Sequence, residues 1–319
     1  NCKIRKANTM IVLITGANGF IGSHIANHFL LAGHTVVATS KQFHESTRTL
    51  LKDAKLVELD VLNTDQLQNL TLQADVLIHV ATANDVISKS NIKGIELSAI
   101  GTKNILDFAV KNQIPKCIVF STLQVYGTEL TGDINESSPT HFQNDYGLNH
   151  LFAEMYAEQY HRQGKVKCAV IRPSNVYGDI LTDSFNRWNL IPGCFCNEAM
   201  ENGTITIKSS GLQMRNFVHV KNLALAVNAI CMDNMDNSEV YNGGSTVHKT
   251  MTEVAGLVKE AFEKQLNKPV KVNIEGSTPE ETNFFSLSID KLQQIGFVEN
   301  EEYNLKTGIQ AIINYLQKK

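Results

Sequence analysis

The chain has 319 residues, of which 43% are hydrophobic and 19% charged, and its formal net charge is −3. This is the composition of an ordinary globular chain, long enough for one large α/β domain or for a domain with an added lobe. The charge excludes a broad basic field of the kind that favours nucleic acid or an acidic membrane surface. No apolar run approaches the ~18 residues of a membrane span.

The first half alternates apolar runs with helical patterns. Strand-like runs are expected within 10–20, 34–40, 55–61, 75–83, 116–127 and 166–178. Helical periodicity is expected over 21–33, 91–114 and 146–163. Strands that alternate with helices predict βαβ units, a parallel sheet and right-handed crossovers. Continuous apolar runs such as MIVLI and CIVF agree, because parallel strands are covered on both faces.

Beyond about residue 180 the pattern loosens. Short strands and turns are expected over 180–195 and 201–220, and helices near 221–233, 250–264 and 305–317. We therefore predict an α/β fold: a Rossmann-type doubly wound parallel sheet with a smaller, mixed α/β C-terminal substrate lobe. The NAD(P)-binding domain is expected to span 10–180 and the lobe 181–319, with some chain crossing back to the sheet near 205–245.

The N-terminal residues bear on targeting, and the cysteines bear on metal binding. The first nine residues, NCKIRKANT, are polar and basic with no apolar stretch behind them, so a signal peptide is not expected. Of six scattered cysteines, Cys194 and Cys196 form a CxC without a second ligand pair, whereas structural zinc needs four well-spaced ligands. We expect no metal site, and a reducing cytoplasm as the location.

A glycine-rich segment, TGANGFIG, lies between the first strand and the first helix. Glycines at 16, 19 and 22 permit a tight turn and let backbone amides approach a pyrophosphate, where the helix N-terminus adds positive potential. Its place at the start of a long βαβ pattern predicts dinucleotide binding.

The choice between NAD and NADP depends on the end of the second strand. That strand ends VVATSK, with Ser40 and Lys41 and without the carboxylate that would bind the ribose 2′-hydroxyl of NAD. Lys41, with Arg48, is suited to a 2′-phosphate, so NADP is favoured and NAD stays open. Asp60, at the end of the third strand, is expected either to accept from the adenine amino group or to cap a helix.

These segments together resemble a known family. TGANGFIG, ELDV, VLIHVATA, VFSTLQVYG, YGLNH, VIRPSNVYG and QMRNFVHV occur in the order seen in extended short-chain dehydrogenases/reductases. Within them the chain resembles the NAD-dependent epimerase/dehydratase family that acts on nucleotide sugars, from about residue 11 to 316.

The resemblance implies roles for individual residues. Thr122 matches the catalytic Ser/Thr that hydrogen-bonds the sugar oxygen, and Tyr146 matches the general acid/base, with His150 where the family has lysine. The residues that it places against the cofactor are Gly16, Asn18, Gly19, Phe20, Ile21, Gly22, Ser40, Lys41, Asp60, Val61, Ala81, Thr82, Tyr146, His150, Pro173 and Ser174. The residues that it places against the substrate are Gln124, Asn175, Arg187 and Arg215.

Two departures from the family bear on the reaction. Leu123 and Gln124 stand where the 4,6-dehydratases have Asp-Glu. Neither side chain can protonate a leaving hydroxyl or abstract the C5 proton of the sugar, so 4,6-dehydration is not expected. His150 is only partly charged at pH 7, so it depresses the pKa of Tyr146 less than lysine would. Losing two to three pKa units would cost on the order of a hundredfold in rate, mainly in sugar oxidation, which needs the phenolate.

We therefore predict an enzyme, most directly a 4-keto-sugar reductase that uses NADPH. A redox-neutral epimerase with tightly bound NAD, a dehydrogenase and a catalytically weak nucleotide-binding protein stay open. A nucleotide sugar is the expected partner, with neither nucleic acid nor membrane. The family's paired helices, here near 93–111 and 146–163, make a homodimer the expected assembly.

Overall fold

The computed structural model describes residues 9–89, 92–183, 185–276 and 284–319. The amino-terminal segment, for which no signal peptide is expected, lies outside these ranges except for Thr9. In the described part of the chain, no helix combines the length and the hydropathy needed to cross a membrane.

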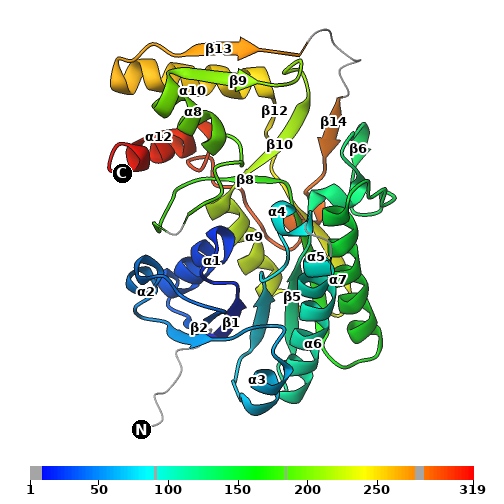
Figure 1. The fold of residues 1–319 in the computed structure, drawn as a ribbon. Helices are drawn as coiled ribbons and strands as arrows, with labels where there is room; N and C mark the ends of the chain where they lie inside the picture. The colour runs from blue at the N-terminus through cyan, green and yellow to red at the C-terminus, as the bar shows by residue number, and fades with distance from the viewer. Residues whose placement is uncertain (1–8, 90–91, 184, 277–283) are drawn as a thin grey trace.

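The centre of the molecule is a seven-stranded sheet, which Figure 1 shows in the lower half. Every neighbouring pair in it is parallel, in the order β11-β7-β5-β4-β1-β2-β3. The strands are β1 (Ile11–Thr15), β2 (Thr35–Ser40), β3 (Lys55–Glu58), β4 (Val76–His79), β5 (Lys116–Phe120), β7 (Lys167–Pro173) and β11 (Glu239–Gly243). The reversal of order beside β1 is the doubly wound arrangement, so the predicted Rossmann-type fold is confirmed.

Helices cover both faces of this sheet (Figure 1). One face carries α1 (Phe20–Leu31), α2 (Glu45–Leu50) and α9 (Val220–Met232). The other carries α3 (Thr64–Asn69), α6 (Gly101–Lys111) and α7 (Asp145–Arg162). The expected helix over 91–114 is built from α5 (Ile92–Ile95), a π-helical turn (Glu96–Ile100) and α6.

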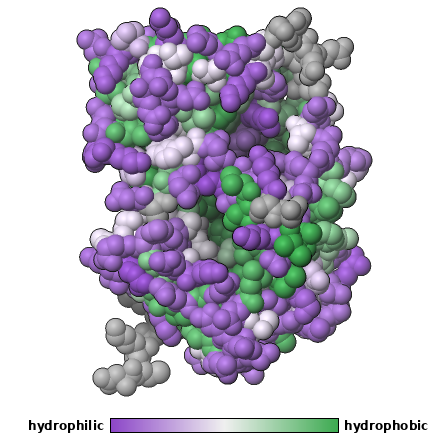
Figure 2. Space-filling view, viewed as in Figure 1, coloured by the Kyte–Doolittle hydropathy of each residue, from purple (hydrophilic) through white to green (hydrophobic). Residues whose placement is uncertain are grey.

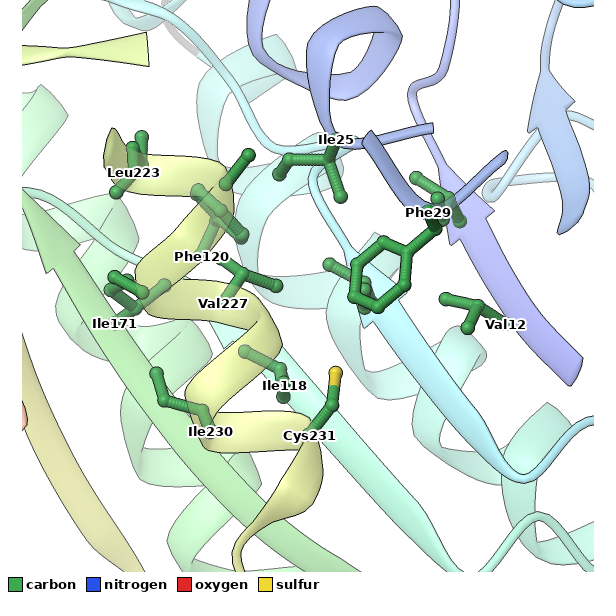
Figure 3. Packing of buried hydrophobic residues seen from close by; sticks show 14 of the residues in the cluster. Val12, Ile25, Phe29, Ile118, Phe120, Ile171, Leu223, Val227, Ile230 and Cys231 are labelled. Carbon is green, nitrogen blue, oxygen red and sulfur yellow. The ribbon is translucent and has the colours of Figure 1, made fainter. Parts of the chain in front are cut away.

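The alternation of side chains along the strands explains the two cores. Val12 and Ile14 of β1 point to the α1 and α9 side, whereas Leu13 points to the α6 and α7 side. On the first side Phe29 of α1 packs toward Val227 of α9 above the central strands, as Figure 3 shows. Because both faces are buried, central strands such as β1 and β5 contain continuous apolar runs.

The upper half of Figure 1 is a lobe of smaller sheets and helices. Its sheets are β12-β10-β8, β13-β9 and β14-β6. The strands are β6 (Gly132–Ile134), β8 (Asn175–Tyr177), β9 (Thr204–Ile207), β10 (Met214–His219), β12 (His248–Thr250), β13 (Lys271–Ile274) and β14 (Phe285–Leu287). The helices are α8 (Gly193–Asn202), α10 (Met251–Leu266) and α12 (Leu305–Leu316), and the short α11 (Asp290–Gln294) lies near β11.

One element of this half differs from the expectation. Helix α8 forms in a region where only short strands and turns are expected, and it begins beside Pro192 and buries Phe195 and Cys196. Strand β11 and helix α9 return from the second half of the chain to the large sheet, within the range 205–245 where some crossing back is expected. The five cysteines of the described residues are free thiols.

Candidate active site

A cavity of about 710 Å³ lies at the carboxyl ends of the central strands, beneath the upper lobe. This edge of a doubly wound sheet, next to the reversal of strand order, is where such folds bind ligands. The cavity brings together most of the residues predicted from the sequence, including Gly16, Asn18, Gly19, Phe20, Ile21, Gly22, Ser40, Ala81, Thr82, Thr122, Gln124, Tyr146, His150, Pro173, Ser174, Asn175, Arg187 and Arg215. Of the predicted residues, Lys41, Asp60 and Val61 do not line it.

The glycine-rich turn forms a cradle, that is, a space that side chains would occupy if its glycines were replaced. Gly16 has a φ of +71°, and a Cβ built on it would lie 2.9 Å from the backbone nitrogen of Ala81. Helix α1 begins after Gly19, and no acidic residue stands in its first turn. Its first amides therefore face the cavity at the positive end of a 12-residue helix, which fits the diphosphate of a dinucleotide.

A second hollow of about 560 Å³ continues past Ser40, and Lys41 and Glu58 line it. Lys41 pairs with Asp60 at 2.7 Å, and Arg48 pairs with Glu58 at 2.6 Å, so each cation already faces a carboxylate. All four side chains are at least partly exposed, and that of Lys41 is 80% exposed. Exposed ion pairs of this kind contribute little free energy.

Asp60 does not cap the following helix. Asn63 is the residue that caps α3, where its side chain accepts from the Gln66 amide. Asp60 instead accepts from the Leu62 amide at 3.0 Å and pairs with Lys41. Val61 is buried in the core on the α6 side.

Thr122 and Tyr146 meet at the floor of the cavity. Thr122 follows β5 and caps a single 3-10 turn, η2 (Leu123–Tyr126). Tyr146 stands in the first turn of α7, which Asn144 caps by accepting from the Gly147 amide at 2.9 Å. A Cβ on Gly147 would lie 2.7 Å from the Gln124 carbonyl oxygen, so glycine allows the start of α7 to approach η2 closely. The hydroxyls of Tyr146 and Thr122 share a hydrogen bond.

The surroundings of Tyr146 favour its protonated form. Burial raises the pKa of Tyr146, and the hydrogen bond with Thr122 opposes that rise. The charges nearby, Asp85 and Arg187, act in opposite directions. At neutral pH Tyr146 is therefore a phenol, which can donate a proton.

His150 is buried one turn further along α7. Its ring lies edge-on to that of Tyr146, with 4.7 Å between the centroids. Its Nε2 lies 3.0 Å from the Ala83 carbonyl oxygen, and its Nδ1 lies 3.2 Å from that of Phe120. Burial lowers the pKa of His150, so the neutral ring has one N–H to donate to one of these two oxygens.

Glu154, one turn after His150 on α7, forms a buried ion pair with Arg172. Arg172 of β7 donates from Nε to Glu154 Oε1 at 2.9 Å, and from Nη2 to Oε2 at 2.6 Å. The Ser121 hydroxyl also donates to Glu154, and the Arg172 guanidinium lies 4.7 Å from the centre of the Tyr126 ring. This group was not predicted from the sequence, although the spacing of Tyr146, His150 and Glu154 puts all three on one helix face.

The remaining predicted residues approach from the lobe side. Asn175 donates from its side chain to the Asn216 carbonyl at 2.8 Å, and Gln124 accepts from Asn144 at 2.9 Å. Arg215 lies on β10, and among the described residues it has no carboxylate partner within an ion-pair distance. Arg215 is exposed, and its guanidinium stays charged at any physiological pH.

The sequence pattern described as "NAD dependent epimerase/dehydratase family" matches residues 12–244, well over half of the chain. The chain belongs to this family. The resemblance drawn from the motifs is thereby confirmed.

Among curated relatives, a protein named "Putative UDP-glucose 4-epimerase" from Methanocaldococcus jannaschii is 28% identical over 316 residues, which cover 96% of this chain and 98% of that protein. UDP-glucuronic acid decarboxylase 6 from Arabidopsis thaliana is 27% identical over 304 residues, covering 92% of this chain and 85% of that protein.

Among solved structures, UDP-glucose 4-epimerase from Thermotoga maritima, determined with UDP-glucose, superposes with a TM-score of 0.82 at 20% identity. That match covers 97% of this chain and 99% of the other. At 20% identity, this similarity establishes a shared fold only.

Proposed function

We propose that the protein reduces the keto group of a UDP-linked 4-keto-sugar with a nicotinamide cofactor. The observation that carries the proposal is the state of Tyr146, a phenol hydrogen-bonded to Thr122, with its pKa raised by burial and with a neutral histidine in place of the family's lysine. Reducing a ketone requires a proton for the new hydroxyl, and a protonated tyrosine can donate it.

The residues fit such a cofactor. The cradle at Gly16 and the amides of α1 would hold its diphosphate, and Pro173 and Ser174 would lie against its nicotinamide. When bound, the cofactor supplies the hydride. The Thr122 hydroxyl would hold the ketone oxygen and Tyr146 would protonate it. Ser174 Oγ is buried without a partner in the described structure, as expected of a group that contacts a ligand.

We propose NADPH as the cofactor. The end of β2 offers the Ser40 hydroxyl and the exposed ammonium of Lys41, and a phosphate dianion can draw Lys41 away from Asp60. The carboxylates of Glu58 and Asp60 oppose this choice, so the preference is expected to be moderate. The adenine would lie near Asp60.

The substrate would enter from the lobe side. Arg215 has no competing carboxylate in the described structure, and a guanidinium suits the two phosphates of a nucleotide sugar. Asn175 and Gln124 would hydrogen-bond the sugar. Uridine is proposed as the base because curated relatives across most of the chain are named for UDP-sugars.

The test is NADPH consumption with a UDP-4-keto-sugar, followed by absorbance at 340 nm. The wild type is expected to oxidise NADPH, and Tyr146→Phe to slow it at least about a hundredfold. Tyr156→Phe, a tyrosine on the same helix outside the cavity, is the matched control and should keep the rate. A Tyr146→Phe variant as active as the wild type would exclude this chemistry.

An epimerase is the second candidate. The observation in its favour is the near full-length match to a protein named as a UDP-glucose 4-epimerase. An epimerase interconverts two UDP-sugars with no net use of cofactor, so product analysis with catalytic NAD separates the two functions.

We propose a homodimer as the assembly. Exposed apolar residues gather on α5, the π-helical turn and α7, among them Ile95, Ile100, Phe152 and Met155. Figure 2 shows hydrophobic residues gathered on this face where Figure 1 places α4 (Asp85–Ser88) and α5. Light scattering should give twice the chain mass, and Met155→Glu should give the monomer.

A further inference from the structure

A charged bridge joins the two halves of the molecule across the cavity. Asp85 begins α4 in the loop after β4, and Arg187 and Asn189 lie in the loop between β8 and α8. Arg187 Nη2 pairs with Asp85 Oδ1, and Asn189 Nδ2 donates to Asp85 Oδ2 at 2.9 Å. Arg187 Nε also donates to Asn189 Oδ1 at 3.3 Å. Both carboxylate oxygens of Asp85 are therefore engaged by the opposite loop.

The bridge stands at the sugar end of the cavity. Burial is the main cause that raises the pKa of Tyr146, and the charges of Asp85 and Arg187 also act on it. Asp85, Arg187 and Tyr146 all line this one cavity. Arg215, proposed to hold the diphosphate, lies on β10.

The charged side chains around the cavity form two groups, an unpaired arginine and a paired aspartate and arginine. Among the described residues, the aspartate, glutamate, lysine and arginine side chains that line it are Asp85, Arg187 and Arg215. Arg215 supplies an unpaired positive charge for phosphate. Near Tyr146 the positive charge of Arg187 is already neutralised by Asp85, and the two side chains are only 19% and 34% exposed.

We propose that Asp85 is a specificity-determining residue, which holds Arg187 in a neutral pair and thereby selects UDP-sugars without a negative charge on the sugar. This inference rests on the proposed function. Hydroxyl groups can donate to Asp85 and accept from Arg187 or Asn189 while the pair stays intact. A carboxylate on the sugar must either lie beside Asp85 or break the pair, and both are unfavourable in a partly buried site.

The experiment measures dissociation constants by calorimetry for UDP, UDP-glucose and UDP-glucuronic acid, which differ in the charge of the sugar. The wild type is expected to bind UDP-glucose at least about tenfold more tightly than UDP-glucuronic acid. Asp85→Asn, which frees Arg187 with little change of shape, should reduce that ratio at least about tenfold. Adding Arg187→Gln to Asp85→Asn should remove the gained affinity for the acid.

Asp236→Asn is the matched control, because Asp236 pairs with Lys167 on an exposed surface and does not line the cavity. It should leave the ratio unchanged. Equal or tighter wild-type binding of UDP-glucuronic acid, or a ratio unaffected by Asp85→Asn, overturns the role of Asp85. Failure of UDP itself to bind overturns the proposed function as well, so the two failures can be told apart.

Discussion

Replacing His150 by lysine tests whether the charge next to Tyr146 sets the direction of the reaction. The two rings are 4.7 Å apart, and the histidine is neutral at pH 7 because burial lowers its pKa. A lysine ammonium about 6 Å from the phenol oxygen, at an effective dielectric constant of about 20, would stabilise the phenolate by ~2.8 kcal/mol. The pKa of Tyr146 would fall by about two units.

The expected result is asymmetric. With His150→Lys, oxidation of a UDP-sugar alcohol at pH 7 should rise by up to about a hundredfold, because a larger fraction of Tyr146 is then phenolate. Ketone reduction should change by less than about threefold, because the phenol still predominates. The assay follows absorbance at 340 nm in both directions from pH 6 to 10, and the rise of the oxidation profile should move to lower pH.

His150→Met is the matched control, since methionine has a similar length and no charge. It should leave the pH profile of oxidation in place. If His150→Lys abolishes both directions while the protein stays folded, the contacts of His150 with the Ala83 and Phe120 carbonyls matter more than its charge, and the reasoning is refuted.

Three further predictions concern stability and cofactor choice. Glu154→Ala should lower the free energy of unfolding in urea by about 3–5 kcal/mol, because Arg172 is left buried without its partner; the exposed control Glu158→Ala should cost less than about 1 kcal/mol, and equal losses would contradict this. Burial lowers the pKa of His79 to about 3, so its contribution to stability is complete above the unfolded-state pKa of about 6.5 and is lost as the pH falls. Between pH 7 and 5 the free energy of unfolding should fall by about 2 kcal/mol more in the wild type than in His79→Gln, and an equal pH dependence of the two proteins would exclude this contribution. Lys41→Ala should raise the KM for NADPH about tenfold and leave that for NADH unchanged, whereas a rise for both would remove Lys41 from phosphate recognition.

The fold and much of the site could be predicted because their signals are local. The glycine turn, the apolar strands and the segment that begins with Tyr146 each carry a pattern within a few residues. The partnership of Asp85 with Arg187 spans 102 residues, and nothing near Asp85 in the sequence indicates it. Helix α8 was missed although its buried Phe195, Cys196 and Ala199 lie at helical spacing and face the core of the lobe.

Ion pairing could not be predicted either. Lys41 was assigned to a phosphate from its position alone, and only the structure shows that Asp60 competes for it. In contrast, Glu154 could have been found, because it follows Tyr146 and His150 at helical spacing and its burial calls for a cation.

Strand β11 has a consequence for how the chain folds as it is synthesised. It pairs along β7 from Glu239↔Ala169 to Gly243↔Pro173, so the outer edge of β7 has no partner until residue 243 has left the ribosome. At about 5–20 residues per second, an apolar strand edge stays open for several seconds, long enough to pair with another nascent chain. A fragment that ends at residue 180 keeps that edge open permanently, and we expect it to aggregate when produced alone.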